Sequence, residues 1–191
     1  ASAASEWLTI TPSSGTLLGG PEALELSISR GGLAAGDYEA AVAIESDGGS
    51  KEIKIQVRVA EDPRLEISPL QIELGTLTES APFALRNTGN VSLAIEITVS
   101  DPALVVSSTT FELSTGAVQD IDVSIDRATI MAGDYTANLS IVSAAGTSEI
   151  QVTYSVAISS EFAFSPDRLE LGQSTSEATI VIQNAGNTGH G

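Results

Sequence analysis

The sequence predicts an all-β fold of tandem immunoglobulin-like antiparallel β-sandwiches, and three observations lead to this prediction. Apolar and polar residues alternate, as in residues 24–29, 51–59 and 120–126, which is typical of strands with one buried face. Runs rich in Gly and Asn separate these stretches, as turns do. The chain also repeats itself at an offset of 97 residues, which is the length of a whole small domain.

The repeat aligns residues 24–90 with residues 121–187 without a gap. Over these 67 pairs, 25 residues are identical, and about a third of the other pairs exchange one apolar residue for another. The segment Ala35-Gly36-Asp37-Tyr38, for example, returns as Ala132-Gly133-Asp134-Tyr135. Two copies of one module therefore account for most of the chain.

The elements expected in each copy follow from this alternation. No segment of helical length carries a 3.6-residue period, so every element is expected to be a strand. Strands are predicted over 24–29, 39–46, 51–59, 120–126 and 136–143, with hairpin turns at 46–50, 87–90, 144–147 and 184–187.

Tyr38 and Tyr135 are predicted to form tyrosine corners. Each ends a recurring Ala-Gly-Asp-Tyr segment that leads into a strand. In such a corner the ring packs at the strand entrance and its hydroxyl bonds back to the backbone. The expected role of both residues is structural.

Composition and charge exclude several classes of function. The chain has 191 residues, of which 42% are hydrophobic, and it contains 8 Lys and Arg against 25 Asp and Glu, giving a net charge of −17. This charge repels nucleic acid and anionic membrane surfaces. The absence of Cys excludes disulfides and thiolate chemistry. No stretch approaches the roughly 20 apolar residues of a spanning helix, so membrane insertion is not expected.

Three stretches of the first copy carry a family resemblance: Trp7-Leu8-Thr9-Ile10-Thr11-Pro12, the Ala-Gly-Asp-Tyr turn, and residues 44–50. Together they resemble the second half of a BACON-type bacterial immunoglobulin-like domain. Residues 65–90 and 162–187 resemble the opening strands of that domain, or of the related hydin-like and choice-of-anchor repeats. The resemblance implies a secreted or cell-surface protein whose domains act as spacers, adhesive modules or sugar binders, with no catalytic residue.

The family's domain boundary would divide the chain into residues 1–60, 64–157 and 161–191. The first segment would be the C-terminal half of an immunoglobulin-like domain, the second a complete domain, and the third the opening strands of a further domain. The alternative division is two complete modules, 1–97 and 98–191, in which Trp7 and Leu104 are equivalent. Both divisions remain open at this point.

Under the first division, the third segment offers the apolar side chains that the first segment lacks. We therefore hypothesise head-to-tail strand complementation, in which residues 161–191 of one chain complete residues 1–60 of the next and a filament grows. The partners would be copies of the chain or neighbouring immunoglobulin-like domains. A piece of a longer tandem array and two plain domains are the alternatives. The side chains expected to make the contact are Phe162, Phe164, Leu169, Leu171, Ala178, Ile180 and Ile182.

The sequence does not favour an enzyme. Its single histidine, His190, is next to the last residue, where chain ends fray, so a Ser-His-Asp arrangement has no base. Aromatic residues make up only 4% of the chain, whereas enzymes that grip sugars need stacking rings. We expect a protein without catalytic activity and without a cofactor.

Asp120, Asp122 and Asp126 are the candidate calcium site. Their spacing on one expected strand gives them a common face, from which carboxylates could bind Ca²⁺ with nearby loops. The corresponding residues of the other copy are Ala23, Glu25 and Ser29, so the pattern does not belong to the module. A solvated strand edge that resists aggregation is the alternative interpretation.

Trp7, the only tryptophan, is the candidate for sugar stacking, although Leu104 at its expected counterpart favours a packing role. Asn90 and Asn138 begin Asn-X-Ser triplets and are candidate glycan acceptors. The sequence as a whole predicts an extracellular or cell-surface array with a structural or adhesive role. Carbohydrate binding is the alternative from another class.

Overall fold

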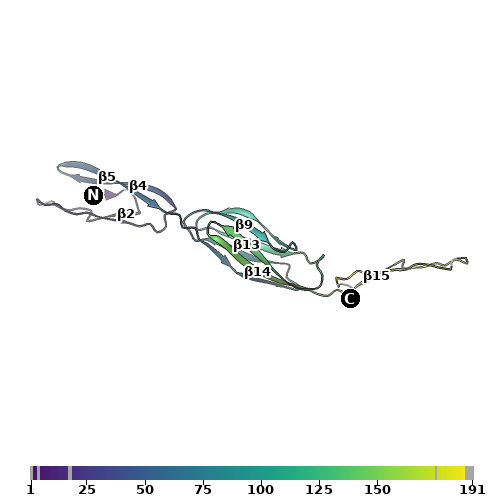
Figure 1. Cartoon of the computed structure of the whole chain (residues 1–191). Helices are drawn as coiled ribbons and strands as arrows, with labels where there is room; N and C mark the ends of the chain where they lie inside the picture. The colour runs from purple at the N-terminus through teal and green to yellow at the C-terminus, as the bar shows by residue number, and fades with distance from the viewer. Residues whose placement is uncertain (1, 4, 17–18, 175, 188–191) are drawn as a thin grey trace.

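The computed structural model is all-β, which confirms the predicted fold class, and it describes residues 2–3, 5–16, 19–174 and 176–187. We call residues 5–60 with strand β1 the head, residues 64–157 the sandwich, and residues 161–187 the tail. The sandwich lies in the middle of an elongated molecule, with the head and the tail at opposite ends (Figure 1). These three names follow the division at residues 60–64 and 157–161 that the sequence predicts. That these parts are separate domains stays a prediction. No helix long and apolar enough to cross a bilayer occurs in the described part of the chain.

Every described element is a strand. The head contains β1 (Ser2–Ala3), β2 (Leu8–Thr11), β3 (Glu25–Ile28), β4 (Gly36–Ser46) and β5 (Gly49–Val59). The sandwich contains β6 (Leu65–Ser68), β7 (Gln71–Gly75), β8 (Ser80–Asn87), β9 (Leu93–Val99), β10 (Leu104–Val106), β11 (Thr110–Leu113), β12 (Val118–Ile125), β13 (Gly133–Ser143) and β14 (Gly146–Val156). The tail contains β15 (Phe162–Ser165) and β16 (Val181–Asn184).

The sandwich consists of two sheets with the strand orders β10-β12-β8-β6 and β11-β9-β13-β14-β7. All of its strand pairs are antiparallel except β7 with β14, which is parallel. The sandwich is thus antiparallel, as predicted, apart from this one edge pair. The chain changes sheets between β6 and β7, so β7 joins the edge of the second sheet in the same direction as β14.

The core of the sandwich is a single apolar cluster between the two sheets. Alternate residues of the long strands point into it, and Phe83, Leu85, Ile121 and Leu139 are among those that are almost completely buried. This alternation is the pattern expected of strands with one buried face.

Apart from Tyr154, Asn87 is the only buried residue with a polar side-chain group in the described part of the chain. Its Nδ2 donates hydrogen bonds to the carbonyl oxygens of Val91 (2.8 Å) and Leu113 (2.9 Å), and its Oδ1 accepts one from the backbone amide of Gly89 (2.9 Å). These bonds compensate for the loss of water on burial. They fix a crossover between the two sheets, because β8 and β9 do not pair with each other. The prediction of a hairpin turn at residues 87–90 is therefore wrong.

The head strands repeat part of the sandwich. Strands β4 and β5 have the bounds of β13 and β14 shifted by 97 residues. Strand β2 is shifted by 96, because Leu8 lies opposite Ile28 as Leu104 lies opposite Ile125. Leu8, which is buried, is thus the counterpart of Leu104, and the expected equivalence of Trp7 with Leu104 is wrong by one residue.

Both tyrosines of the recurring Ala-Gly-Asp-Tyr segment hydrogen-bond to the backbone four residues upstream. The Tyr38 hydroxyl donates to the carbonyl oxygen of Ala34 (2.9 Å), and the Tyr135 hydroxyl donates to that of Met131 (2.8 Å). This is the bond that a tyrosine corner makes. It holds the loop before β4 and β13 against the start of the strand.

Candidate functional site

The joint between head and sandwich is centred on Asn90. Its backbone carbonyl accepts a hydrogen bond from the Ala35 amide (2.9 Å), and its backbone amide donates to the carbonyl oxygen of Asp62 (3.2 Å). Its side chain accepts from the Asp62 amide (2.7 Å) and donates to the carbonyl oxygen of Ala60 (2.9 Å). One residue of the sandwich thus binds both the linker and the loop before β4.

The joint between sandwich and tail contains the same bonds around Asn187. The Asn187 carbonyl accepts from the Ala132 amide (3.0 Å), and its amide donates to the carbonyl oxygen of Ser159 (3.1 Å). Its side chain accepts from the Ser159 amide (2.7 Å) and donates to the carbonyl oxygen of Ala157 (2.8 Å). Each partner lies 97 residues after its counterpart in the first joint.

A glycine in each joint allows the backbone to approach closely. A Cβ atom added to Gly89 would overlap the carbonyl oxygen of Asp62 and lie 2.6 Å from the amide nitrogen of Arg64. A Cβ added to Gly186 would overlap the carbonyl oxygen of Ser159 in the same way. Only glycine fits this approach without a shift of the linker.

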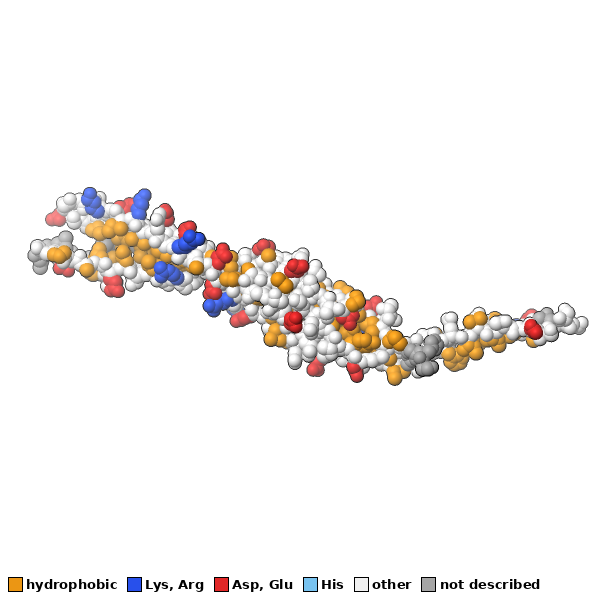
Figure 2. All heavy atoms as spheres, viewed as in Figure 1, with side chains coloured by type: hydrophobic (Ala, Val, Ile, Leu, Met, Phe, Trp, Pro, Cys, Tyr) orange, Lys and Arg blue, Asp and Glu red, His pale blue; other side chains and the backbone are white. Residues whose placement is uncertain are grey.

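The head presents an apolar face where the sandwich has a core. Leu24 and Leu26 are 39% and 41% exposed, whereas their sandwich counterparts Ile121 and Val123 are 1% and 0% exposed. Ile53, on β5, is also exposed. Figure 2 shows apolar side chains gathered along the head. We call the surface of Leu24, Leu26 and Ile53 the head face.

The tail is an extended hairpin whose apolar side chains are exposed along its length (Figure 2). Ile180 and Ile182 are 53% and 71% exposed, whereas their counterparts Phe83 and Leu85 are 1% and 0% exposed. The remaining side chains predicted for strand complementation, which are Phe162, Phe164, Leu169, Leu171 and Ala178, are exposed as well. Contiguous apolar surface of this kind is typical of interaction sites.

Two long-range pairings of the sandwich are missing within the head and within the tail, and the strands concerned are short or absent there. Strand β12 pairs with β8 from Val118 to Ser124, whereas β3 has only β2 beside it and spans four residues. Residues 168–172, the counterparts of β7, form no strand. Because β7 pairs only with β14, its ladder needs a neighbour that the tail does not provide.

The three aspartates of the candidate calcium site are not gathered into a group. Asp120 and Asp122 are exposed on β12, and Asp126 follows the end of that strand, where its Oδ1 accepts a hydrogen bond from the amide of Ala128 (3.0 Å). In the described part of the chain, no group of three or more His, Asp or Glu residues could hold a metal ion.

Trp7 packs within the head. Its ring meets that of Tyr38 edge-on, with 6.2 Å between the ring centroids, and its side chain is half-buried. In the sandwich, Tyr135 stacks on Tyr154 at 5.1 Å instead. Sugar stacking by Trp7 stays a prediction, and this packing leaves only part of the ring accessible.

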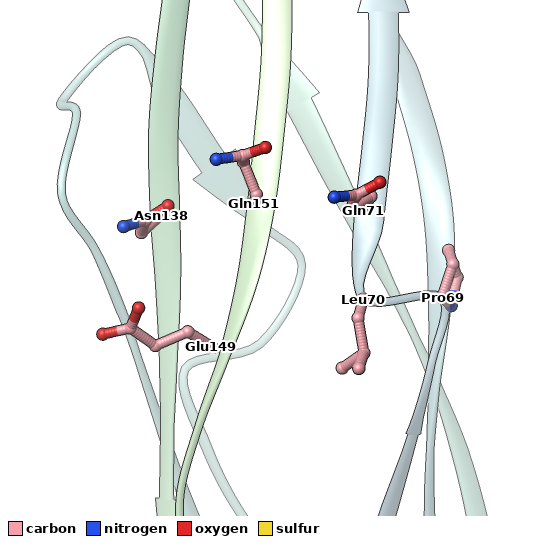
Figure 3. A pocket seen from close by; sticks show the side chains of 6 residues that line it. All are labelled: Pro69, Leu70, Gln71, Asn138, Glu149 and Gln151. Carbon is pink, nitrogen blue, oxygen red and sulfur yellow. The ribbon is translucent and has the colours of Figure 1, made fainter.

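The two candidate glycan acceptors differ in their surroundings. The side-chain nitrogen of Asn90 donates a hydrogen bond to the carbonyl oxygen of Ala60 in the first joint, so a glycan on that nitrogen would lie within the joint. Asn138 is exposed on β13 and lines a shallow groove of about 590 Å³ with Pro69, Leu70, Gln71, Glu149 and Gln151 (Figure 3). Glycosylation stays a prediction at both positions.

The head is the part of the chain that a known family describes. Residues 1–60 match the viral BACON domain family. The match covers the head and confirms the resemblance to BACON-type domains over these residues. No curated protein matches the chain.

Among solved structures, the chain resembles small all-β domains at low identity. A PapD-like domain of human CEP192 is 15% identical, with a TM-score of 0.42, over 48% of this chain and 84% of that one. A Porphyromonas gingivalis protein of unknown function is 17% identical, with a TM-score of 0.43, over 80% and 81%. The CsuC-CsuE complex of a chaperone and a tip adhesion subunit from Acinetobacter baumannii is 9% identical, with a TM-score of 0.45, over 65% and 73%.

Two features of the BACON-like head and its neighbour were not predicted from sequence. The first is the pair of Asn joints, although Asn-X-Gly-Asn recurs at residues 87–90 and 184–187. The second is Arg127, whose guanidinium donates hydrogen bonds to four backbone carbonyl oxygens. The repeat aligns Arg127 with Arg30, so an arginine occupies this position in both copies. This recurrence could have indicated that the residue has a role in the fold.

Proposed function

We propose that the chain is a non-enzymatic structural module of an extracellular array, in which immunoglobulin-like units follow one another through joints of fixed geometry. The observation that supports the proposal is the recurrence of one set of hydrogen bonds around Asn90 and Asn187. The array would act as a spacer or as an adhesive stalk. Its partners would be neighbouring immunoglobulin-like domains or copies of the chain.

The chemistry of the joints favours a stiff array. Each linker is short and bonds through its backbone to an asparagine that uses its amide hydrogen, carbonyl oxygen and both side-chain polar groups. A flexible tether would be rich in Gly and Ser and would lack such bonds. A stiff series of sandwiches sets the distance between its two ends, which is what a spacer requires.

The charge of the chain fits the same role. The net charge of −17 keeps elongated molecules soluble and limits non-specific association. The joints still form in this charged surface because they are made of backbone and amide groups. At the first joint, Arg64 also contacts both carboxylate oxygens of Asp62, at 3.0 Å each.

Carbohydrate binding remains the second candidate, and the groove beside Asn138 favours it. Amide and carboxylate groups of Gln71, Asn138, Glu149 and Gln151 line this groove (Figure 3), and such groups bond well to sugar hydroxyls. None of its six lining residues is aromatic. Since rings supply most of the apolar contact in sugar sites, we rank this function second.

The proposal is tested by measuring how rigid the first joint is. The chain has no cysteine, so Glu52→Cys and Thr110→Cys place one spin label on each side of the joint. Labelled chain is diluted into unlabelled chain, and the distance distribution is measured by double electron–electron resonance. We expect a single narrow distribution that broadens when Asn90→Ala removes the side-chain bonds.

An exposed asparagine provides the control for this experiment. Asn138→Ala changes the same side chain on β13, outside the joint, and should leave the distribution unchanged. A broad distribution in the unmodified chain would contradict the proposal, and so would a distribution that Asn90→Ala does not alter.

A further inference from the structure

We propose that the tail of a second copy docks on the head face and supplies the head with the counterparts of β6, β7 and β8, while the Arg30 guanidinium donates hydrogen bonds to the backbone of the incoming tail. The inference rests on the proposed function, because it specifies how one copy of the array meets the next. The contact has a defined register, and Arg30 of the head holds the tail in that register.

The sandwich itself shows how the two segments fit. In it, β8 lies antiparallel to β12, with Phe83 opposite Ile121, and β7 lies parallel to β14, with Ile72 opposite Val152. The head carries the counterparts of β12 and β14, and the tail carries those of β8 and β7. In one molecule these segments lie at opposite ends (Figure 1).

The tail is already shaped for this docking. In the sandwich, β6 pairs with β8 from Leu65 opposite Asn87 to Ser68 opposite Ala84. In the tail, β15 pairs with β16 from Phe162 opposite Asn184 to Ser165 opposite Val181. Each pair of the tail hairpin is shifted by 97 residues from a pair of the sandwich. The incoming hairpin therefore needs no change of register to bind as β6 and β8 do.

Arg127 shows what Arg30 would bind. The Arg127 guanidinium donates to the carbonyl oxygens of Leu74 (3.3 Å) and Gly75 (2.9 Å) at the end of β7 and of Thr78 (2.9 Å) in the loop that follows. It also donates to the carbonyl oxygen of Ser155 on β14 (3.1 Å). We call these four hydrogen bonds the clasp. They hold the end of β7 and the loop between β7 and β8 against β14.

Arg30 has no such clasp in the head. It is exposed, and its guanidinium makes no hydrogen bond or ion pair within the described residues. The counterparts of Leu74 and Gly75 are Leu171 and Gly172 of the tail. A docked tail would bring the carbonyl oxygens of these two residues to Arg30, whose fork of donors suits several acceptors at once.

A second copy is the occupant that the geometry favours. The two joints hold head and tail on opposite ends of the sandwich, so a chain's own tail is kept away from its own head. Strand β5 carries Lys51, Lys54 and Arg58, and cationic side chains gather on the head in Figure 2. In the proposed register Glu170 of the tail faces Gln56, between Lys54 and Arg58, and Arg168, which pairs with Glu170, faces Lys54. The match of apolar residues, and not charge, therefore selects a second copy.

The register is tested with two single-cysteine variants of the full chain. Asp122 lies opposite Pro82 in the sandwich, so Glu25 of one copy should lie opposite Thr179 of another. Glu25→Cys and Thr179→Cys chains are mixed under mild oxidation and the mixed disulfide is quantified by mass. Because the chain has no other cysteine, this disulfide can only join two copies. The control mixes the Glu25→Cys chain with a Gln183→Cys chain. Residue 183 lies four residues from residue 179, the position that the register places opposite Glu25.

The clasp is tested in the same assay. We expect Arg30→Ala in the Glu25→Cys chain to lower the yield of the mixed disulfide at least tenfold. Arg30→Lys should not restore the yield of the mixed disulfide. A lysine ammonium group keeps the positive charge but lacks the several N–H donors that the guanidinium directs at different acceptors. Arg86→Ala removes an equal charge from the exposed side of β8 and should have no effect. The fluorescence of Trp7, which contacts Tyr38 in the head, verifies that each variant keeps the head folded.

Equal yields for the paired and the displaced cysteines would overturn the proposed docking, as would an undiminished yield with Arg30→Ala and a folded head. Either result would leave the narrow spin-label distribution across the first joint untouched. Failure of the docking and failure of the rigid array are therefore distinguishable.

Discussion

At the scale of single residues, the polar groups inside the sandwich bear most directly on its stability. Tyr154 is 2% exposed, and its hydroxyl donates a 2.6 Å hydrogen bond to Oδ2 of Asp101. Burial, together with the bonded and charged carboxylate, raises the pKa of Tyr154 to about 12. The neutral hydroxyl is thus the form that the folded state requires.

This shift predicts how stability depends on alkaline pH. The unfolded tyrosine loses its proton near pH 10, whereas the folded one keeps it to about pH 12. The stabilisation is therefore complete below pH 10 and is lost as the pH rises toward 12. We expect the free energy of unfolding to fall by on the order of 2 kcal/mol across this interval, measured by urea denaturation at constant ionic strength.

Tyr154→Phe is the matched variant for this measurement. It keeps the ring against Tyr135 but has no proton to lose, so its stability should vary less between pH 10 and pH 12. If the two proteins lose stability in parallel over this interval, Tyr154 is not the group responsible.

At the scale of elements, each strand forms where a neighbour is available to complete its ladder. The alternation of apolar residues predicted strands in both copies, and the predicted stretches 39–46, 51–59 and 136–143 lie within β4, β5 and β13. The same alternation in residues 168–172 gives no strand, because the pairing that forms β7 in the sandwich is missing in the tail. The alternation in a segment thus predicts that the segment can form a strand. The strand forms only where a neighbouring strand is present to pair with it.

The sequence predicted the turns less well than the strands. Residues 46–50 form the expected hairpin between β4 and β5, but residues 87–90 cross between sheets and carry the first joint. Composition could not separate these cases, since both stretches are rich in turn-forming residues. The contacts of Asn90 with Ala35 and Ala60 join residues far apart in the chain, which no local pattern reveals.

The joint predicts the effect of adding one methyl group. Gly89→Ala places a Cβ against the backbone of Asp62 and Arg64, which must shift or lose hydrogen bonds. We expect it to lower the free energy of unfolding by about 1–3 kcal/mol, as overpacking does, in urea titrations followed by circular dichroism.

Gly48→Ala serves as the comparison for this variant. Its added Cβ would meet only the side-chain oxygen of Ser46, at an ordinary contact distance of 3.6 Å. It should therefore change stability by less than Gly89→Ala. Equal effects of the two substitutions would show that the close approach in the joint is not tightly packed.

At the scale of the whole molecule, the chain is elongated, and the proposed contact joins its two ends. The sandwich buries its apolar residues in one cluster, whereas the head and the tail, at opposite ends of the molecule, expose several counterparts of those residues, among them Leu24, Leu26, Ile180 and Ile182 (Figure 1). A contact that joins one end to the other end of a second copy is heterologous, and it propagates when it does not close on itself. Growth of this kind would extend the array without a new type of interface.

Head-to-tail contact between copies is tested most directly by the mass of the full chain in solution as a function of concentration, by light scattering. We expect masses that rise above the 19.6 kDa of one copy as concentration increases. Ile180→Asp combined with Ile182→Asp, which places two charges in the proposed contact, should keep the chain at the mass of one copy. A single-copy mass for the unmodified chain at every concentration would contradict head-to-tail contact.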